Sequence, residues 1–313
     1  MLMAAVARGD PWRFQAHPEI WALIAGLALL YVYAIRRIGP RVTRPGEVVV
    51  TRSQVAWFVV SLTVLWAATD WPVHDLGEEY LYSVHMAQHL LLSFVVASTA
   101  LLATPTWLAR LVVGQARAYR TVRWLTRFVP ATLLFNGVVV FSHWPVIVNA
   151  SASNGLLHYG VHVLVMASAL VMWMPVCGPL PELRFSLAAQ MPYLFLQSVI
   201  PTLPAGWLTF AEGIVYRSYD VVPRVWDLSP TDDQQIAGME MKILGGFFLW
   251  TVITVLFVRF ATRVAEDDRA SGVAMDRRAP VARGADGEVL TWEQVQQALD
   301  TAPPAPRESD LPR

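Results

Sequence analysis

Residues 79–104 read EYLYSVHMAQHLLLSFVVASTALLAT, and this stretch decides the fold. As a helix it is long enough to cross the ~30 Å of hydrocarbon in a bilayer, and from Leu90 onward it is almost wholly apolar. Its first half nevertheless carries two histidines, His85 and His89, four positions apart. Ionisable groups inside a membrane turn toward the protein interior, so the stretch predicts a helical bundle with a polar site.

The composition of the whole chain agrees with a membrane protein. Hydrophobic residues make up 55% of it and charged residues 15%, whereas soluble domains carry about a quarter charged residues. The 24 basic and 24 acidic residues balance, which argues against nucleic acid as a partner. The single cysteine, Cys177, excludes an intramolecular disulfide framework and any CxxC motif. We therefore expect an all-α, polytopic protein in a lipid bilayer.

Hydropathy predicts about seven transmembrane helices. They are expected near residues 19–36, 54–71, 79–104, 129–149, 156–175, 187–212 and 234–260. Arginines gather in the first and third connections and after the last span, so the positive-inside rule places the N-terminus outside and the C-terminus in the cytoplasm.

The same pattern predicts three regions along the chain. Residues 1–18 form an extracytoplasmic segment, residues 19–262 the seven-helix membrane domain, and residues 263–313 a cytoplasmic tail that is mostly disordered. Within the tail, Thr291 and Gln294 form the pattern of a capping box, which predicts a short helix near 291–300.

Histidines are the most informative residues of the chain. All seven fall outside or in the outer half of a span in this topology, and His158 and His162 repeat the spacing of His85 and His89. Residues four apart share one face of a helix, so each pair can converge on one ion. A lone intramembrane histidine more often bonds a neighbouring helix, but two pairs in one leaflet favour a metal site. The predicted ligands are the two pairs, a third histidine at similar depth and two thioethers at the start of the last span: His85, His89, His158, His162, His143, Met239 and Met241.

Three stretches together resemble the bacterial CtaG-type cytochrome c oxidase assembly factors. They are HMAQHLLL at 85–92, the HxxxH pair at 158–162 and DQQIAGMEM at 233–241, and the likeness covers roughly residues 15–262. The resemblance implies a multi-pass protein of the bacterial plasma membrane that helps mature a haem-copper oxidase by supplying copper on the outer side. It further implies oxidase subunits and other copper carriers as partners, and metal delivery rather than catalysis.

Other interpretations stay open at this point. The histidines can be axial ligands of a b-type haem in an electron-transfer protein. Di-iron membrane desaturases also use HxxxH pairs, but that family needs more histidine boxes and presents them to the cytoplasm. A structural scaffold that holds an oxidase subunit needs no metal at all. The sequence shows no serine nucleophile motif, phosphate loop or dinucleotide fingerprint.

Overall fold

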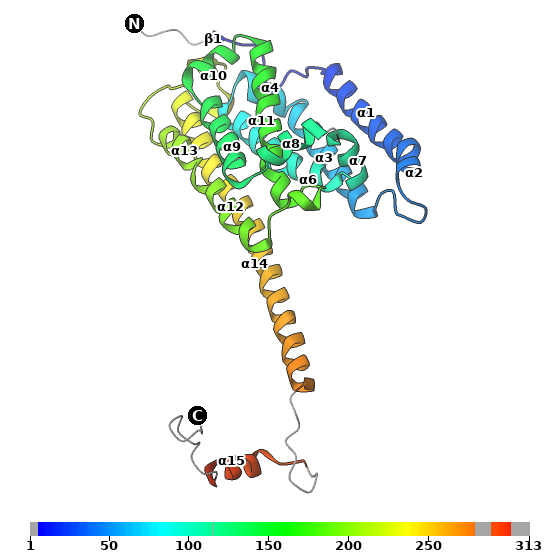
Figure 1. Ribbon diagram of the computed structural model, residues 1–313. Coiled ribbons are helices and arrows are strands. Elements are labelled where there is room, and N and C mark those ends of the chain that lie inside the picture. Colours follow the sequence, from blue (N-terminus) through cyan, green and yellow to red (C-terminus); the bar gives the residue numbers. More distant parts are fainter. Residues whose placement is uncertain (1–5, 115, 279–288, 302–313) are drawn as a thin grey trace. The chain divides into compact units, whose positions relative to one another are not determined.

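The computed structural model describes residues 6–114, 116–278 and 289–301, and it confirms the all-α class (Figure 1). Within these residues the strands assigned to a sheet are two short segments, β1 (Val6–Ala7) and β2 (Val221–Val222), which pair in parallel. Everything that positions the predicted site is helical.

Six helical stretches follow the predicted spans. They are α1 (Pro18–Tyr33) with its continuation η1 (Ala34–Ile38) and α2 (Gly39–Val42), α3 (Arg52–Thr69), the rod of α5 (Tyr82–Leu90), η2 (Leu91–Val96) and α6 (Ala97–Ala103), α9 (Phe128–Ser142), α11 (Gly155–Cys177), and α14 (Pro230–Arg278). Shorter elements connect or extend them: α4 (Val73–Glu79), α7 (Thr106–Val113), α8 (Ala116–Leu125), α10 (Pro145–Ser151), η3 (Pro181–Leu183), α12 (Leu187–Val199), α13 (Thr202–Thr209), η4 (Arg217–Tyr219), η5 (Val225–Asp227) and α15 (Trp292–Thr301).

Membrane crossing is supported by length and hydropathy for fewer than seven helices. Among the described residues, four helices are long and apolar enough to span a bilayer, and two bent pairs raise the number to six. These pairs are α3 with α4, bent by 45°, and α8 with α9, bent by 77°. The expected span 187–212 is divided near Pro201 into α12 and α13, of 13 and 8 residues. Seven spans and the orientation of the termini remain predictions.

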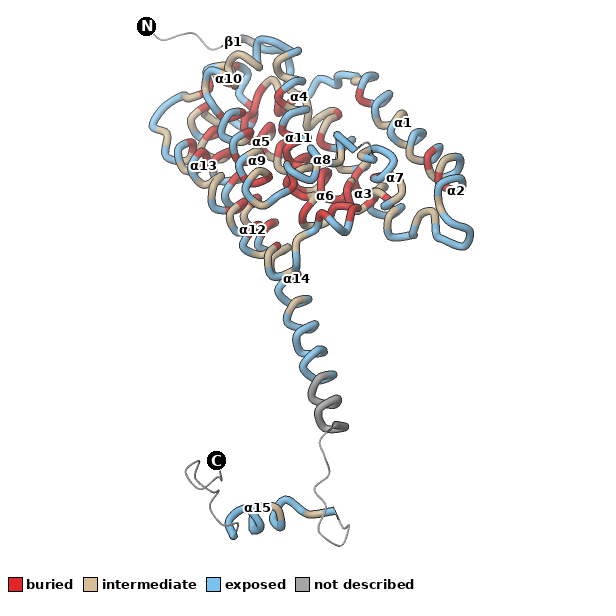
Figure 2. The backbone as a smooth tube through the Cα atoms, viewed as in Figure 1, coloured by how far each residue is buried: buried red, intermediate tan, exposed pale blue. Residues whose placement is uncertain are grey.

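An aromatic core holds the bundle together. It is built by α5–η2–α6, α9, α11, α12 and α14, and we define it by Phe94, Phe135, Trp173, Tyr193 and Leu249, each at most 7% exposed. Figure 2 shows buried residues concentrated along α5 and α6, whereas α1 is largely exposed. Leu29 and Leu30 on α1 are 70% and 66% exposed, which suits side chains that face lipid.

The chain divides into two compact units, residues 1–259 and 260–313. In the second unit, helix α14 continues to Arg278, so residues 263–278 are helical where we expected disorder; alanine, arginine and glutamate in this stretch favour a helix. Helix α15 begins directly after Thr291, whose backbone N–H donates to Gln294 Oε1 at 2.7 Å. The rest of the expected disorder concerns residues 279–288 and 302–313, which lie outside the described residues.

Candidate metal centre

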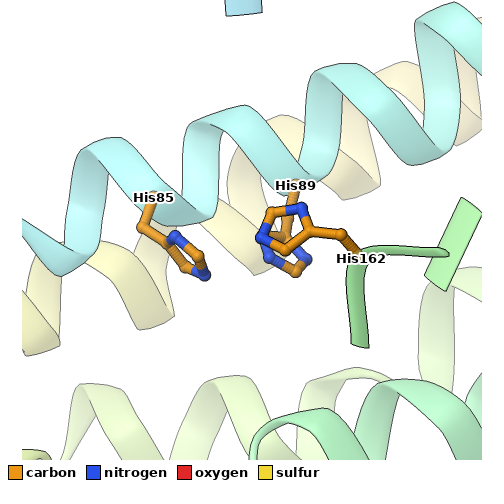
Figure 3. Close-up of side chains that lie close together, drawn as sticks. All are labelled: His85, His89 and His162. Atoms are coloured by element: carbon orange, nitrogen blue, oxygen red, sulfur yellow. The ribbon is translucent and has the colours of Figure 1, made fainter. Parts of the chain in front are cut away.

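Two helices bring the predicted histidine pairs together. His85 and His89 project from α5, and His158 and His162 from α11. The ring centroids of His89 and His162 lie 4.7 Å apart, and those of His85 and His162 lie 5.5 Å apart, across the interface between the two helices (Figure 3). The spacing of four residues thus presents one face of each helix to the other, as expected.

A carboxylate that the sequence did not reveal joins the four imidazoles. Glu78 lies in the last turn of the short helix α4, and its Oε2 lies 2.9 Å from Nε2 of His158. Its Oε1 lies 3.2 Å from Nδ1 of His85 and 3.7 Å from Nε2 of His162. We call Glu78, His85, His89, His158 and His162 the histidine cluster. One feature of the sequence points to Glu78: it is an acidic residue that directly precedes the predicted span 79–104, on the same side of the membrane as the histidines.

The polar atoms of the cluster point at one another. One nitrogen of each of the four histidines and Oε1 of Glu78 are buried. The carboxylate lies within hydrogen-bond distance of His158 Nε2 and His85 Nδ1, whereas Nε2 of His89 and Nε2 of His162 have no hydrogen-bond partner among the described residues. Most buried polar atoms in proteins are paired, so these two nitrogens need an explanation. Two subsets, His85–His89–His162 and Glu78–His158–His162, each offer three ligand atoms within 4.8 Å of one another. A cation among them would satisfy the unpaired atoms.

Helix α4 is held tightly against α5, which fixes Glu78. Gly77 makes this approach possible, because a Cβ there would lie 3.0 Å from the backbone nitrogen of His85. Asp70, at the bend between α3 and α4, accepts hydrogen bonds from the indoles of Trp21 and Trp66 at 2.8 and 2.7 Å. These contacts attach the start of α4 to α1 and α3.

Asp75 on α4 makes a second attachment, to the residue before α1. The buried Asp75 carboxylate lies 3.1 Å from Nε2 of His17. Burial lowers the pKa of His17, but the hydrogen bond and charge of Asp75, together with Glu19, more than offset this and raise it above its ordinary value. Protonated His17 and the buried carboxylate therefore form an ion pair, which links α4 to the start of α1.

Asp233 fixes the helix that carries the first histidine pair. Its carboxylate lies on α14, is 2% exposed, and accepts the backbone N–H groups of Tyr82 and Ser83 at 2.7 and 3.0 Å. These are among the N–H groups that a helix N-terminus leaves unpaired, and the charge also suits the helix dipole. Asp233 is the first residue of the stretch DQQIAGMEM. It contributes to the site by holding the N-terminus of α5, the helix that carries His85 and His89, in place.

Tyrosines close the cluster on one side. Tyr82 stacks on His85 at 5.8 Å, and the rings of Tyr216 and Tyr219 lie 4.5 and 5.1 Å from Tyr82. Tyr216 and Tyr219 come from the loop after α13, where burial raises the pKa of both phenols above the ordinary value. They therefore stay protonated at neutral pH and supply a neutral wall.

Three cavities meet the cluster. A small one of about 30 Å³ lies among the five cluster residues. A second, of about 50 Å³, extends from His89 toward Met86, His143 and Met241. The third is far larger, about 690 Å³, and is bounded by α1, α3 and α11; of the cluster it meets Glu78, His158 and His162. Glu78, His158 and His162 thus line the large cavity as well as the smallest one, whereas His85 and His89 line only small ones.

The remaining predicted ligands, His143, Met239 and Met241, belong to neither subset of ligand atoms. His143 ends α9, where its Nδ1 bonds Val139 O at 2.6 Å and its Nε2 is unpaired, and it lines both small cavities. Met241 is buried and lines the second cavity. Met239 is 41% exposed, because residues two apart on a helix point about 200° away from each other. The structure therefore brings together four of the seven predicted ligands.

Comparison with known proteins gives a family. A model of the cytochrome c oxidase caa3 assembly factor family (Caa3_CtaG) matches residues 29–263, which include the whole histidine cluster and Asp233. The comparisons with curated proteins and with solved structures found no match. The matched region covers most of the chain and all helices that build the site. This chain belongs to the cytochrome c oxidase caa3 assembly factor family.

Proposed function

We propose that this protein binds copper in the histidine cluster and helps to insert it into cytochrome c oxidase. The observation that carries the proposal is the convergence of four imidazoles and one carboxylate from three helices, with buried Nε2 atoms of His89 and His162 that lack hydrogen-bond partners among the described residues. Such groups are costly inside a membrane protein, and a bound cation offsets that cost.

The donor set suits copper in a carrier. Imidazole binds copper well, and a site without thiolates releases its ion more readily than a closed thiolate site does. The single cysteine lies outside the cluster, where its Sγ contacts the carbonyl oxygens of Ser98 and Trp173 at 3.7 and 3.6 Å. Met86 and Met241 beside the second cavity add thioethers, which favour copper(I).

Family membership supports an assembly role rather than catalysis. Apolar helices such as α5–η2–α6 and α11 suit a location in the bacterial plasma membrane. The partners are then the subunits of a cytochrome c oxidase, which receive the ion, and extracytoplasmic copper carriers, which supply it.

A b-type haem is the competing ligand. Pockets for organic ligands usually measure about 300–1,000 Å³. The cavity that all five cluster residues line is about 30 Å³, a size that suits an ion. The large cavity of about 690 Å³ falls within the range for organic ligands, but of the four histidines only His158 and His162, which lie on the same helix, line it. The family match gives no support to haem. An optical spectrum of the purified protein distinguishes the two, because haem gives a Soret band and copper does not.

The test is complementation of a deletion strain of the source bacterium. Wild-type protein should restore oxidase activity and the copper content of the purified oxidase. The variant with both His89→Leu and His162→Leu should accumulate in the membrane but restore neither. Cys177→Ser is the matched control, because it removes a thiol that could bind copper but lies outside the cluster. This variant should restore both the oxidase activity and the copper content.

The result that would overturn the copper proposal is a fully copper-loaded, active oxidase in cells that contain only the double histidine variant. The assembly role given by the family would survive that result. A histidine-independent scaffold would then be the better description.

A further inference from the structure

The two ligand subsets of the cluster differ in their surroundings. Glu78, His158 and His162 all line the large cavity of about 690 Å³. His85 and His89 are not among its lining residues, and they meet only the small cavities. An ion that arrives through the large cavity therefore meets the first subset before the second.

The subsets also differ in charge. The first contains a carboxylate, whose charge attracts a cation strongly where the surrounding dielectric constant is low. The second consists of three imidazoles, His85, His89 and His162. Glu78 Oε1 lies 3.2 Å from Nδ1 of His85, so the charge of the carboxylate also reaches a cation at this second subset, although Glu78 is not one of its ligands.

One residue belongs to both subsets. His162 lies between the two, with its ring centroid 4.4 Å from that of His158 and 4.7 Å from that of His89. Each subset uses one ligand atom of His162. If the same ring nitrogen of His162 serves both subsets, an ion that moves between them keeps this ligand while it exchanges the others.

We propose that the cluster contains two alternative copper positions that share His162. The entry position is formed by Glu78, His158 and His162, and the enclosed position by His85, His89 and His162. An ion is captured at the entry position and passes to the enclosed position by exchanging Glu78 and His158 for His85 and His89. No electron or proton transfer is needed, since only ligands are exchanged. This inference rests on the proposed function, because it takes copper as the ion.

The arrangement predicts two classes of variant. Glu78→Gln and His158→Gln remove entry ligands, so they should slow copper uptake by about tenfold but leave one copper bound per chain at equilibrium. His85→Gln and His89→Gln remove enclosed ligands, so uptake should stay fast while release to a chelator becomes about tenfold faster. His162→Gln should impair both.

The experiment uses the full chain, purified in detergent and stripped of metal. Cu²⁺ is added, uptake is followed by rapid mixing with a chromophoric chelator, and bound copper is measured by mass spectrometry after gel filtration. Tyr159→Phe is the control, because this residue lines the large cavity beside His158 but contributes no atom to either subset. It should behave as wild type in both rates.

Three results would overturn the inference. Equal effects of all five substitutions on uptake and release would indicate one site with five ligands. Wild-type behaviour of Glu78→Gln and His158→Gln would exclude an entry position. Two coppers per wild-type chain would exclude alternative occupancy. A wild-type protein that binds no copper fails differently, because it removes the proposed function as well.

Discussion

The two halves of the α5–η2–α6 rod and of α11 differ in how their buried polar groups are hydrogen-bonded. In the second half of the α5–η2–α6 rod and of α11, two polar side chains of the aromatic core are paired. Trp173 Nε1 donates to Ser93 O at 2.9 Å, and the hydroxyl of Tyr193 donates to Met172 O at 2.9 Å. In the first half, the histidine cluster leaves Nε2 of His89 and Nε2 of His162 buried without hydrogen-bond partners among the described residues.

This difference separates stability from function within one bundle. The aromatic core supplies packing and satisfied hydrogen bonds, which hold α11 against η2 and α6. The histidine cluster adds little to that and carries a cost that a cation can remove. Substitutions in the aromatic core should therefore lower stability, whereas substitutions in the histidine cluster should reduce copper binding.

Substitution of Trp173 by alanine should give the largest loss of stability. The side chain is 1% exposed in the aromatic core, so its removal leaves a cavity and should lower the free energy of unfolding by about 3–5 kcal/mol. His89→Leu removes an unpaired polar group of similar size and should change that free energy by less than about 1 kcal/mol. Unfolding in detergent, followed by circular dichroism, measures both. A metal-free His89→Leu variant as unstable as Trp173→Ala would remove the distinction between the two halves.

Gly77→Ala tests the contact that positions Glu78. The added Cβ would lie 3.0 Å from the backbone nitrogen of His85, so α4 must shift, at a cost of about 1–3 kcal/mol. Copper uptake should fall as in Glu78→Gln. Gly160→Ala is the control, because it lies between the histidines of α11 but has no atom within 4 Å of the added Cβ. Equal copper uptake by the two variants would show that α4 does not position a ligand.

Asp233→Asn should weaken the N-terminal cap of α5. The substitution removes the charge and one acceptor from the N–H groups of Tyr82 and Ser83, and should cost about 1–2 kcal/mol. Because α5 carries His85 and His89, release of copper should also become faster. Asp232→Asn, at the exposed neighbouring position, is the control. It should change the stability and the rate of copper release less than Asp233→Asn does. Unchanged copper release in a destabilised Asp233→Asn variant would confine this residue to a structural role.

The smallest effect concerns pH and the pair formed by His17 and Asp75. Because the folded pKa of His17 is raised, the pair stabilises the protein below the ordinary pKa of 6.5, and this contribution is lost as pH rises through the raised value. His17→Asn should therefore lower the free energy of unfolding by less than about 1 kcal/mol at about pH 5, which thermal unfolding detects as a slightly lower unfolding temperature. At about pH 9 the substitution should have no such effect. A larger effect at the alkaline pH would contradict the sign of this linkage.

The sequence predicted what local periodicity determines. The two HxxxH pairs, the all-α class and the capped helix after Thr291 all follow from spacings of three or four residues. Met239 and Met241 show where prediction from the local sequence fails. Both are predicted ligands because of their sulfur atoms, but residues two positions apart on a helix cannot face the same site.

What the sequence did not reveal depends on contacts between distant segments. Glu78 becomes part of the cluster only because α4 turns back onto α5 at Gly77, and no spacing in the sequence encodes that turn. The break near Pro201 similarly divides a stretch that hydropathy alone treats as one span. Pro201 is a local signal for that break, because proline removes a backbone N–H and disrupts a helix, whereas the turn of α4 onto α5 is set by tertiary packing.

The most direct test of the central claim is X-ray absorption spectroscopy of the copper-loaded protein. The claim is that imidazoles of the histidine cluster hold the ion. The predicted spectrum shows nitrogen ligands at about 2.0 Å with the multiple scattering of imidazole rings, and this signal is lost when His89 and His162 are both replaced by leucine. A spectrum dominated by sulfur, or an imidazole signal that survives the double replacement, would contradict the account.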